Sequence, residues 1–174
     1  FRRMKMQHIR PKTTEWFTYF PEDYRWSAAI GGMLGLAVVG ASDMGEIDRT
    51  ARKLKNKLGD DEAWFFTWQE LGDELKQKAD DCRNRGHTIS ASVFYLRASC
   101  YYQWGERFRT VKDDHALNVY RKSVECFHEH AQLSISPKIE IVEVPYEGNF
   151  LPGYFVHAEN TKKSKNPTMI FFDG

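Results

Sequence analysis

The sequence predicts an α+β chain, in which a helical domain comes first and the opening strands of a sheet follow. Apolar residues recur at steps of three and four as far as about residue 135, which is the period of amphipathic helices. From Lys138 the pattern changes to the alternation that is typical of strands. An apolar run from Pro167 to Gly174 follows. This order predicts a domain boundary near residues 134–137.

The amino-terminal part is predicted to be a leader followed by two helices. Residues 1–21 carry five basic side chains and then an aromatic cluster. Pro21 suits the first turn of a helix, because an N–H at that position would have no partner, and this helix should continue to about Gly40. A second helix, from Gly45 to Leu58, follows the cap candidate Asp43.

Three longer helices are predicted next, each with an apolar stripe on one face. The third begins at Asp60 or Asp61 and ends near Gly86, and the fourth follows Thr88. The fifth begins at Asp113 or Asp114, and its predicted buried stripe is Leu117, Tyr120, Val124, Phe127 and Ala131. The short turns between them predict antiparallel hairpins that resemble tetratricopeptide stacking without a clean internal repeat. A helical hairpin array is therefore an alternative for this region.

Three strands are predicted after the helices. Residues 138–146 and 151–158 should pair as a hairpin. Residues 168–172 are uniformly apolar, as in a strand that is buried on both faces. The chain is thus divided into a leader (1–21), a helical domain (22–136) and the first three strands of a sheet domain (137–174).

Composition argues against several classes of function. The chain has 25 basic and 24 acidic residues, so no overall field would hold nucleic acid or an anionic membrane. The apolar run Ala28–Ala41 is too short to span about 30 Å of hydrocarbon. Three cysteines without paired spacing favour a reducing compartment, so the cytoplasm is the default location. His128 and His130 point in different directions on a helix, and neither a metal nor another cofactor is predicted.

Three segments, taken in their order along the chain, resemble a known family. They are the stretch Gly40–Glu46, the helical segment Tyr95–Tyr102 and the hairpin sequence Val144–Phe155. Together they resemble α/β hydrolases with an amino-terminal helical cap, a group that includes dihydroxypseudooxynicotine hydrolase and the fungal pigment hydrolases that shorten polyketides. The resemblance covers roughly residues 20–174. It implies that the chain is the cap and the first strands of a hydrolase sheet.

The resemblance also implies where the catalytic residues lie. A serine, an acidic residue and a histidine are expected on the remaining carboxyl-terminal part, and His157 is interpreted as a surface or packing residue. In this family the loop after the third strand supplies one oxyanion donor, and Asp173 and Gly174 stand at its start. Glycine suits such a loop because the backbone must approach the reacting carbonyl closely. The alternative is a plain turn after a strand.

Substrate-binding candidates lie in the helical region. Tyr101, Tyr102 and Trp104 form an aromatic group that could floor a cleft between cap and sheet, and core packing is the alternative. Arg97 could orient an acidic or phenolic substrate through its planar guanidinium, or it could form a structural salt bridge.

Asp43 and Glu46 are two further candidates, at the predicted start of the second helix. A ligand or the other domain could meet their carboxylates there. The plain alternative is a capping box, in which Asp43 and Glu46 satisfy backbone N–H groups of the helix.

The expected function is that of a serine-type α/β hydrolase, acting on an ester or on a carbon–carbon bond next to a ketone in an aromatic or polyketide-like substrate. The expected partners are the remaining carboxyl-terminal part and a small-molecule substrate; a homodimer is left open, and the fragment alone should be inactive. The alternative is a helical-hairpin adaptor that binds a partner without catalysis. The hydrolase interpretation depends on residues 168–172 being an interior strand, since an unpaired apolar strand would promote aggregation.

Overall fold

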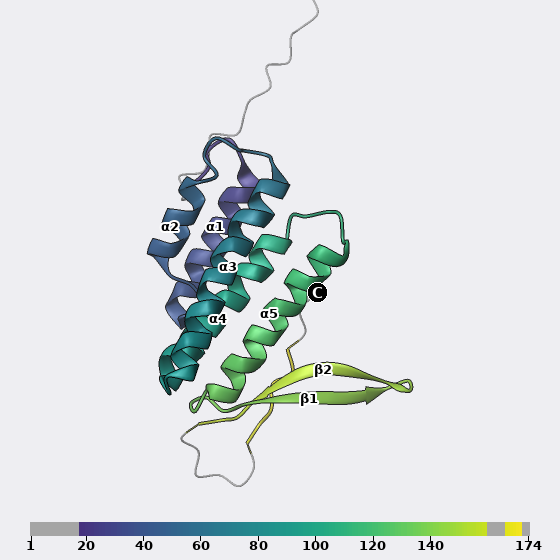
Figure 1. Ribbon diagram of the computed structural model, residues 1–174. Helices are drawn as coiled ribbons and strands as arrows, with labels where there is room; N and C mark the ends of the chain where they lie inside the picture. Colours follow the sequence, from purple (N-terminus) through teal and green to yellow (C-terminus); the bar gives the residue numbers. More distant parts are fainter. Residues whose placement is uncertain (1–17, 160–165, 172–174) are drawn as a thin grey trace, which may run out of the picture.

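A computed structural model describes residues 18–159 and 166–171 (Figure 1). The described elements are, in order, α1 (Tyr24–Leu36), the 3₁₀ helix η1 (Ala37–Val39), α2 (Met44–Arg52), α3 (Asp61–Asn84), α4 (Thr88–Glu106), α5 (Asp114–Leu133), β1 (Ile139–Tyr146) and β2 (Asn149–Val156). The predicted order of helices followed by a hairpin is confirmed.

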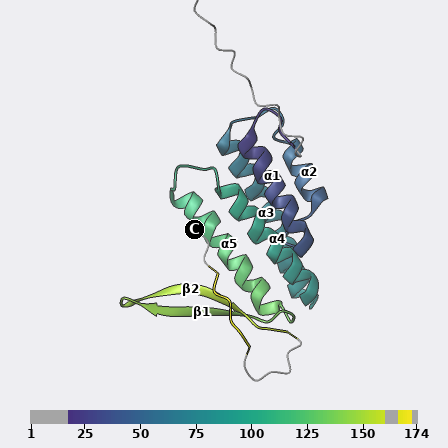
Figure 2. The same ribbon diagram turned by 180° about the vertical axis from the view of Figure 1, so that it is seen from behind.

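The helices form a bundle in which α3 and α4 occupy the middle. Helix α5 packs along one side of this pair, while α1 and α2 lie on its other side (Figures 1 and 2). The hairpin β1–β2 projects from the carboxyl end of α5. One flank of the bundle is therefore continuous with the sheet, and the opposite flank is formed by α1 and α2.

Aspartates begin four of the five helices. The side chains of Asp23, Asp43, Asp60 and Asp113 each accept a hydrogen bond from the backbone N–H three residues further on, which satisfies a donor that the helix itself leaves unpaired. The first two helices are shorter than predicted. Helix α1 starts after Asp23 rather than at Pro21, and the residues after Arg52 form turns instead of extending α2 to Leu58.

The core is rich in aromatic side chains. Trp26, Trp64, Trp68, Tyr101 and Tyr102 are each fully buried. Adjacent rings contact one another at tilted or stacked angles, as is favourable for aromatic pairs.

Helices α3 and α4 approach closely where glycine removes a side chain. A Cβ atom on Gly72 of α3 would lie 2.6 Å from the ring of Tyr102, and one on Gly105 of α4 would lie 2.9 Å from the Cβ of Trp68. Real Cβ contacts are not that short, so each glycine is required by a large aromatic residue on the facing helix.

The buried face of α5 differs from the predicted one. The residues packed against the bundle include Ala116, Val119, Ser123 and Cys126, whereas Leu117 and Tyr120 of the predicted stripe are 40% and 54% exposed. Both the predicted and the observed stripe have helical spacing. The residues of the observed stripe are smaller, which allows α5 to approach α4 closely. At this contact the Ser123 hydroxyl donates to the Ser99 carbonyl at 3.0 Å. The larger stripe lies beside this face. Of its other members, Val124 and Phe127 are half-buried and Ala131 is buried.

The hairpin pairs antiparallel, with Ile141 opposite Tyr154. Glu147 and Gly148 both have positive φ, 44° and 77°, as a two-residue turn with the right twist requires. The ring of Tyr154 packs edge-on against Phe127 of α5, with ring centroids 4.6 Å apart. The hairpin thus covers the carboxyl-terminal end of the larger α5 stripe.

The third predicted strand is not formed. Residues 167–171 have no strand assignment, and the side chains of Met169, Ile170 and Phe171 are 89%, 74% and 85% exposed. A strand needs a neighbouring strand for its backbone hydrogen bonds, and the sheet among the described residues contains β1 and β2 alone. The expectation of a buried strand is therefore wrong for residues 168–171. Residue 172 lies outside the described ranges.

Within the described ranges, none of the helices combines the length and the apolar character needed to cross a membrane.

Candidate functional site

The predicted candidates Asp43, Glu46, Arg97 and Tyr101 come together where α2 begins. The Tyr101 hydroxyl of α4 accepts a hydrogen bond from the Asp43 backbone N–H at 2.9 Å and donates to Glu46 Oε2 at 3.0 Å. The Asp43 carboxylate accepts from the Glu46 N–H at 3.0 Å. The arrangement is a capping box in which a tyrosine from another helix lies between the cap N–H and the glutamate.

Arg97 completes this cluster from the same helix as Tyr101. Its Nη2 lies 3.3 Å from Glu46 Oε1, and the two side chains are only 17% and 14% exposed. The guanidinium also lies over the Phe94 ring, 5.0 Å from its centroid. Among the described residues, the buried Nε of Arg97 has no hydrogen-bond partner.

The cluster is electrostatically balanced. Burial raises the pKa of Glu46, and the Arg97 charge and the Tyr101 hydroxyl oppose that rise. Burial likewise raises the pKa of Tyr101 far above its usual value, so the phenol stays protonated and donates to the carboxylate. These contacts connect α2 to α4. They match the two structural alternatives given above, a capping box at Asp43 and Glu46 and a salt bridge at Arg97.

The aromatic candidates of α4 lie in the core. Tyr101 and Tyr102 are fully buried, and the Tyr102 hydroxyl donates to Asp73 Oδ1 at 2.6 Å, beside Lys122 Nζ at 2.7 Å from the same oxygen. Neither ring is available to floor an open cleft, so core packing, the alternative, holds for both. Trp104 is half-buried, and its ring fills the space beside Gly32 of α1.

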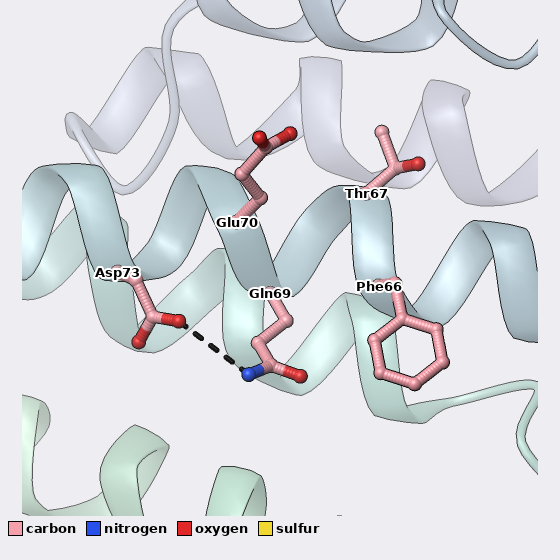
Figure 3. Close-up of a pocket in the computed structure, with 5 residues that line it drawn as sticks. All are labelled: Phe66, Thr67, Gln69, Glu70 and Asp73. Atoms are coloured by element: carbon pink, nitrogen blue, oxygen red, sulfur yellow. Dashed lines mark hydrogen bonds between the residues drawn. The ribbon is translucent and has the colours of Figure 1, made fainter.

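A shallow pocket of about 430 Å³ lies on α3 (Figure 3), lined by Phe66, Thr67, Gln69, Glu70 and Asp73. In it the Gln69 amide donates to Asp73 Oδ2 at 3.4 Å. None of the predicted site residues lines this pocket. Its polar residues lie on the solvent-exposed side of an amphipathic helix. In the sequence, such a pattern indicates an exposed helix face and does not indicate a pocket.

A second hollow of about 640 Å³ lies beside β2, where residues 166–171 return toward the hairpin. Its lining residues are Tyr154, Phe155, Val156, His157, Ala158, Asn166, Pro167, Thr168, Met169 and Phe171. His157 Nε2 lies 3.0 Å from Glu140 Oε1, and both side chains are partly exposed, which agrees with its interpretation as a surface or packing residue. The oxyanion candidates Asp173 and Gly174 lie outside the described residues.

A metal site is not formed by the part of the chain that the structure describes, because it contains no group of three or more His, Cys, Asp or Glu side chains positioned to share an ion.

Comparison with known proteins links this fold to hydrolases. The chain matches no protein-family model. It is 29% identical over 133 residues to "Hydrolase acrC" of Aspergillus aculeatus, covering 75% of this chain and 30% of that protein. It is 25% identical over 140 residues to "Alpha/beta hydrolase ucsC" of Acremonium sp., covering 75% and 28%. "Alpha/beta hydrolase psoB" of Aspergillus fumigatus is 28% identical over 127 residues, covering 70% and 28%.

A solved structure shows the same fold. The structure titled 2,6-dihydroxy-pseudo-oxynicotine hydrolase superposes with a TM-score of 0.53 at 21% identity, covering 70% of this chain and 32% of that one. The chain thus spans about 30% of the length of the proteins that it matches. The resemblance to α/β hydrolases is confirmed, and the five helices and the hairpin fit a helical cap followed by the start of an α/β-hydrolase fold.

Proposed function

We propose that this chain forms the helical cap and the first hairpin of a serine-type α/β hydrolase, whose nucleophile, acid and histidine lie on a remaining carboxyl-terminal part. The observation that carries the proposal is the similarity, over about three quarters of the chain, to three fungal proteins named as hydrolases. The sequence contains no Gly-x-Ser-x-Gly turn, which is where a hydrolase of this type holds its nucleophile. We propose the cytoplasm as its location, because its cysteines lack disulfide spacing.

The proposed reaction is cleavage of an ester, or of a carbon–carbon bond next to a ketone, in an aromatic or polyketide-like substrate. The solved neighbour is named for hydrolysis of 2,6-dihydroxy-pseudo-oxynicotine, and that name supports this class. A serine would attack the carbonyl, and the loop that begins at Asp173 and Gly174 would donate an N–H to the oxyanion. No cofactor is needed for these steps.

The substrate cleft would lie between α5 and the sheet domain. Leu117 and Tyr120 are exposed on α5, and the same stripe is covered by Tyr154 of the hairpin at its other end. Clefts between domains are favoured ligand sites. Tyr101 and Tyr102 would then act from the core, by holding α2 and α3 in place through their hydroxyl groups.

A labelling experiment on the native protein tests this function. An antibody raised against the folded chain would capture the polypeptide from cells, and a fluorophosphonate probe would report a reactive serine. We expect the captured polypeptide to be labelled and to be longer than the 20.4 kDa chain, and we expect the isolated chain to remain unlabelled. A captured polypeptide that is not labelled, although folded, would contradict a serine hydrolase.

The helical-hairpin adaptor is the second candidate function. The exposure of Met169, Ile170 and Phe171 favours it, because an apolar segment without a sheet to enter could instead bind a partner. The same capture separates the two functions. A native polypeptide of 20.4 kDa that stays unlabelled and monomeric would support the adaptor.

A further inference from the structure

The β1–β2 hairpin meets the helical bundle through few side chains. Every residue of the two strands is half-buried or exposed, and the hairpin projects from the carboxyl end of α5 (Figures 1 and 2). Its ion pairs, from Lys138 and His157 to Glu140, stay within the hairpin and the residues beside it. A two-stranded hairpin without a core of its own depends on contacts with other elements for its position.

Tyr154 of β2 supplies those contacts. Its ring centroid lies 4.6 Å from that of Phe127 and 5.8 Å from that of His128, both on α5. Its hydroxyl oxygen lies 3.2 Å from His128 Nε2. Within residues 18–159 and 166–171, no other hydrogen bond, ion pair or ring contact joins a residue of β1 or β2 to a helix. One side chain thus accounts for the specific contacts of the hairpin with α5.

The connection between α5 and β1 has no regular structure. Helix α5 ends at Leu133, and the Ser134 N–H donates to the His130 carbonyl at 2.9 Å. Residues 134–138 then form neither helix nor strand, and the Ser134 hydroxyl donates to the Pro137 carbonyl inside this segment at 2.8 Å. A few residues of this kind absorb the φ/ψ changes of a hinge. The hairpin can therefore turn about residues 134–138 whenever Tyr154 does not hold it.

Tyr154 lies at one end of the exposed apolar stripe of α5. Leu117 and Tyr120, which are 40% and 54% exposed, belong to the same stripe as Phe127. Burial raises the pKa of Tyr154, and the nearby Tyr120 phenol adds to that rise. The angle between the hairpin and α5 therefore sets how far this stripe lies from any sheet that continues from the hairpin.

We propose that Tyr154 is a latch, which holds the hairpin at one angle to α5 and, when it opens, lets the helical domain swing about residues 134–138. One aromatic contact and one hydrogen bond favour the closed state roughly 10-fold to 100-fold. An open state populated on the order of 1–10% is therefore expected at equilibrium. The latch itself follows from the contacts of Tyr154. Its effect, which is to open and close the cleft between α5 and the sheet, rests on the proposed function.

Residual dipolar couplings of the weakly aligned chain test the latch. In the wild type, the backbone amides of the helices and of the hairpin should fit one alignment tensor of nearly equal magnitude. Tyr154→Ala should lower the magnitude for the hairpin at least about twofold, because an unlatched hairpin samples many angles on a time scale below milliseconds. The matched control Tyr146→Ala removes a tyrosine of similar exposure, 55% against 46%, from the same hairpin and should leave the two magnitudes nearly equal.

Two further variants separate the parts of the latch. Phe127→Ala changes α5 instead of the hairpin and should release the hairpin to the same extent. Tyr154→Phe keeps the ring and loses the hydroxyl, so it should give an intermediate reduction. Cross-strand amide contacts and circular dichroism verify that the hairpin and the helices still form. A hairpin that stays aligned with the helices in Tyr154→Ala overturns the latch, and so does a wild-type hairpin that is already decoupled from them.

The effect on the cleft is tested separately, in the native polypeptide. If the proposed function holds, Tyr154→Ala should change the rate of fluorophosphonate labelling at least about threefold, since the helical domain no longer closes at one angle, and Tyr146→Ala should not. An unchanged rate with a released hairpin overturns the role of the latch in the cleft. If neither the wild type nor the variant is labelled, the proposed hydrolase fails and the role in the cleft fails with it, while the alignment of the hairpin still decides the latch.

Discussion

The hydroxyl oxygen of Tyr101 lies 2.9 Å from the backbone nitrogen of Asp43, although 58 positions separate the two residues. This hydrogen bond joins the start of α2 to the middle of α4. The same hydroxyl donates to Glu46, so one buried phenol satisfies a helix N–H and a carboxylate together. It explains how a helix as short as α2 is held in a fixed position.

Tyr101→Phe removes that connection while keeping the ring. We expect a loss of about 1–3 kcal/mol in the free energy of unfolding, because the partly buried Asp43 N–H loses its partner and the half-buried Glu46 carboxylate loses one of its two partners. Urea unfolding at pH 7 measures it. Tyr120→Phe, on a 54% exposed residue, is the matched control and should change stability little. Equal effects of the two substitutions would contradict the role of the Tyr101 hydroxyl.

The ionisation of Glu46 should make stability depend on pH. Burial raises the pKa of Glu46 in the folded chain above its ordinary 4.5, so folding favours the protonated acid. The resulting contribution to stability is complete below the unfolded pKa and is lost as the pH rises through the folded pKa. Glu46→Gln removes this titration. The stability of the wild type relative to Glu46→Gln should therefore fall as the pH rises from about 4, just below the ordinary pKa of glutamate.

Urea midpoints of the two proteins, measured from about pH 4 upward, test the sign. A difference that grows in favour of the wild type as the pH rises would mean that the ion pair with Arg97 outweighs the burial of Glu46.

Two glycines of the bundle should respond to alanine in opposite ways. Gly72→Ala should destabilise the chain by about 1–3 kcal/mol, because its Cβ would lie 2.6 Å from the Tyr102 ring. Gly31→Ala should stabilise it by up to about 1 kcal/mol, since nothing described lies within 4 Å of that position. Thermal melts of both variants, compared with that of the wild type, measure the two effects. A stabilising Gly72→Ala would refute the packing of α3 on α4.

The three cysteines should differ in reactivity. Burial raises the pKa of Cys100 and of Cys126 to about 12, and the thiolate is the reactive form. Cys82 is only half-buried. Alkylation by iodoacetamide at pH 8, followed by peptide mapping, should modify Cys82 at least about tenfold faster than the other two. Uniform modification of a folded sample would disagree with this core.

Local patterns predicted most of the helices, and long-range contacts explain what they missed. Aspartate caps act within one turn, so the sequence places them to within one residue: it offers Asp60 or Asp61 and Asp113 or Asp114, and the structure has Asp60 and Asp113. Helix α5 carries two apolar stripes of similar period, and periodicity cannot say which one packs on the bundle. The carboxylate partner of Tyr102 is Asp73, 29 positions away, which no local pattern reveals.

The candidate site was only partly predictable. The sequence offers a capping pair as one alternative for Asp43 and Glu46, but the hydroxyl between them comes from another helix. Residues 168–171 are apolar enough for a buried strand, yet a strand also requires a neighbouring strand for its backbone hydrogen bonds. The composition of the segment does not reveal whether such a neighbour is present. That segment remains the point on which the hydrolase proposal depends.

Hydrogen exchange of residues 168–171 in the native polypeptide tests the central claim most directly. If this chain is the start of a larger hydrolase sheet, the backbone amides of these residues should exchange at least about 100-fold more slowly in the native polypeptide than in the isolated chain. Exchange that is equally fast in both would show that no sheet receives this segment, and the hydrolase account would fail.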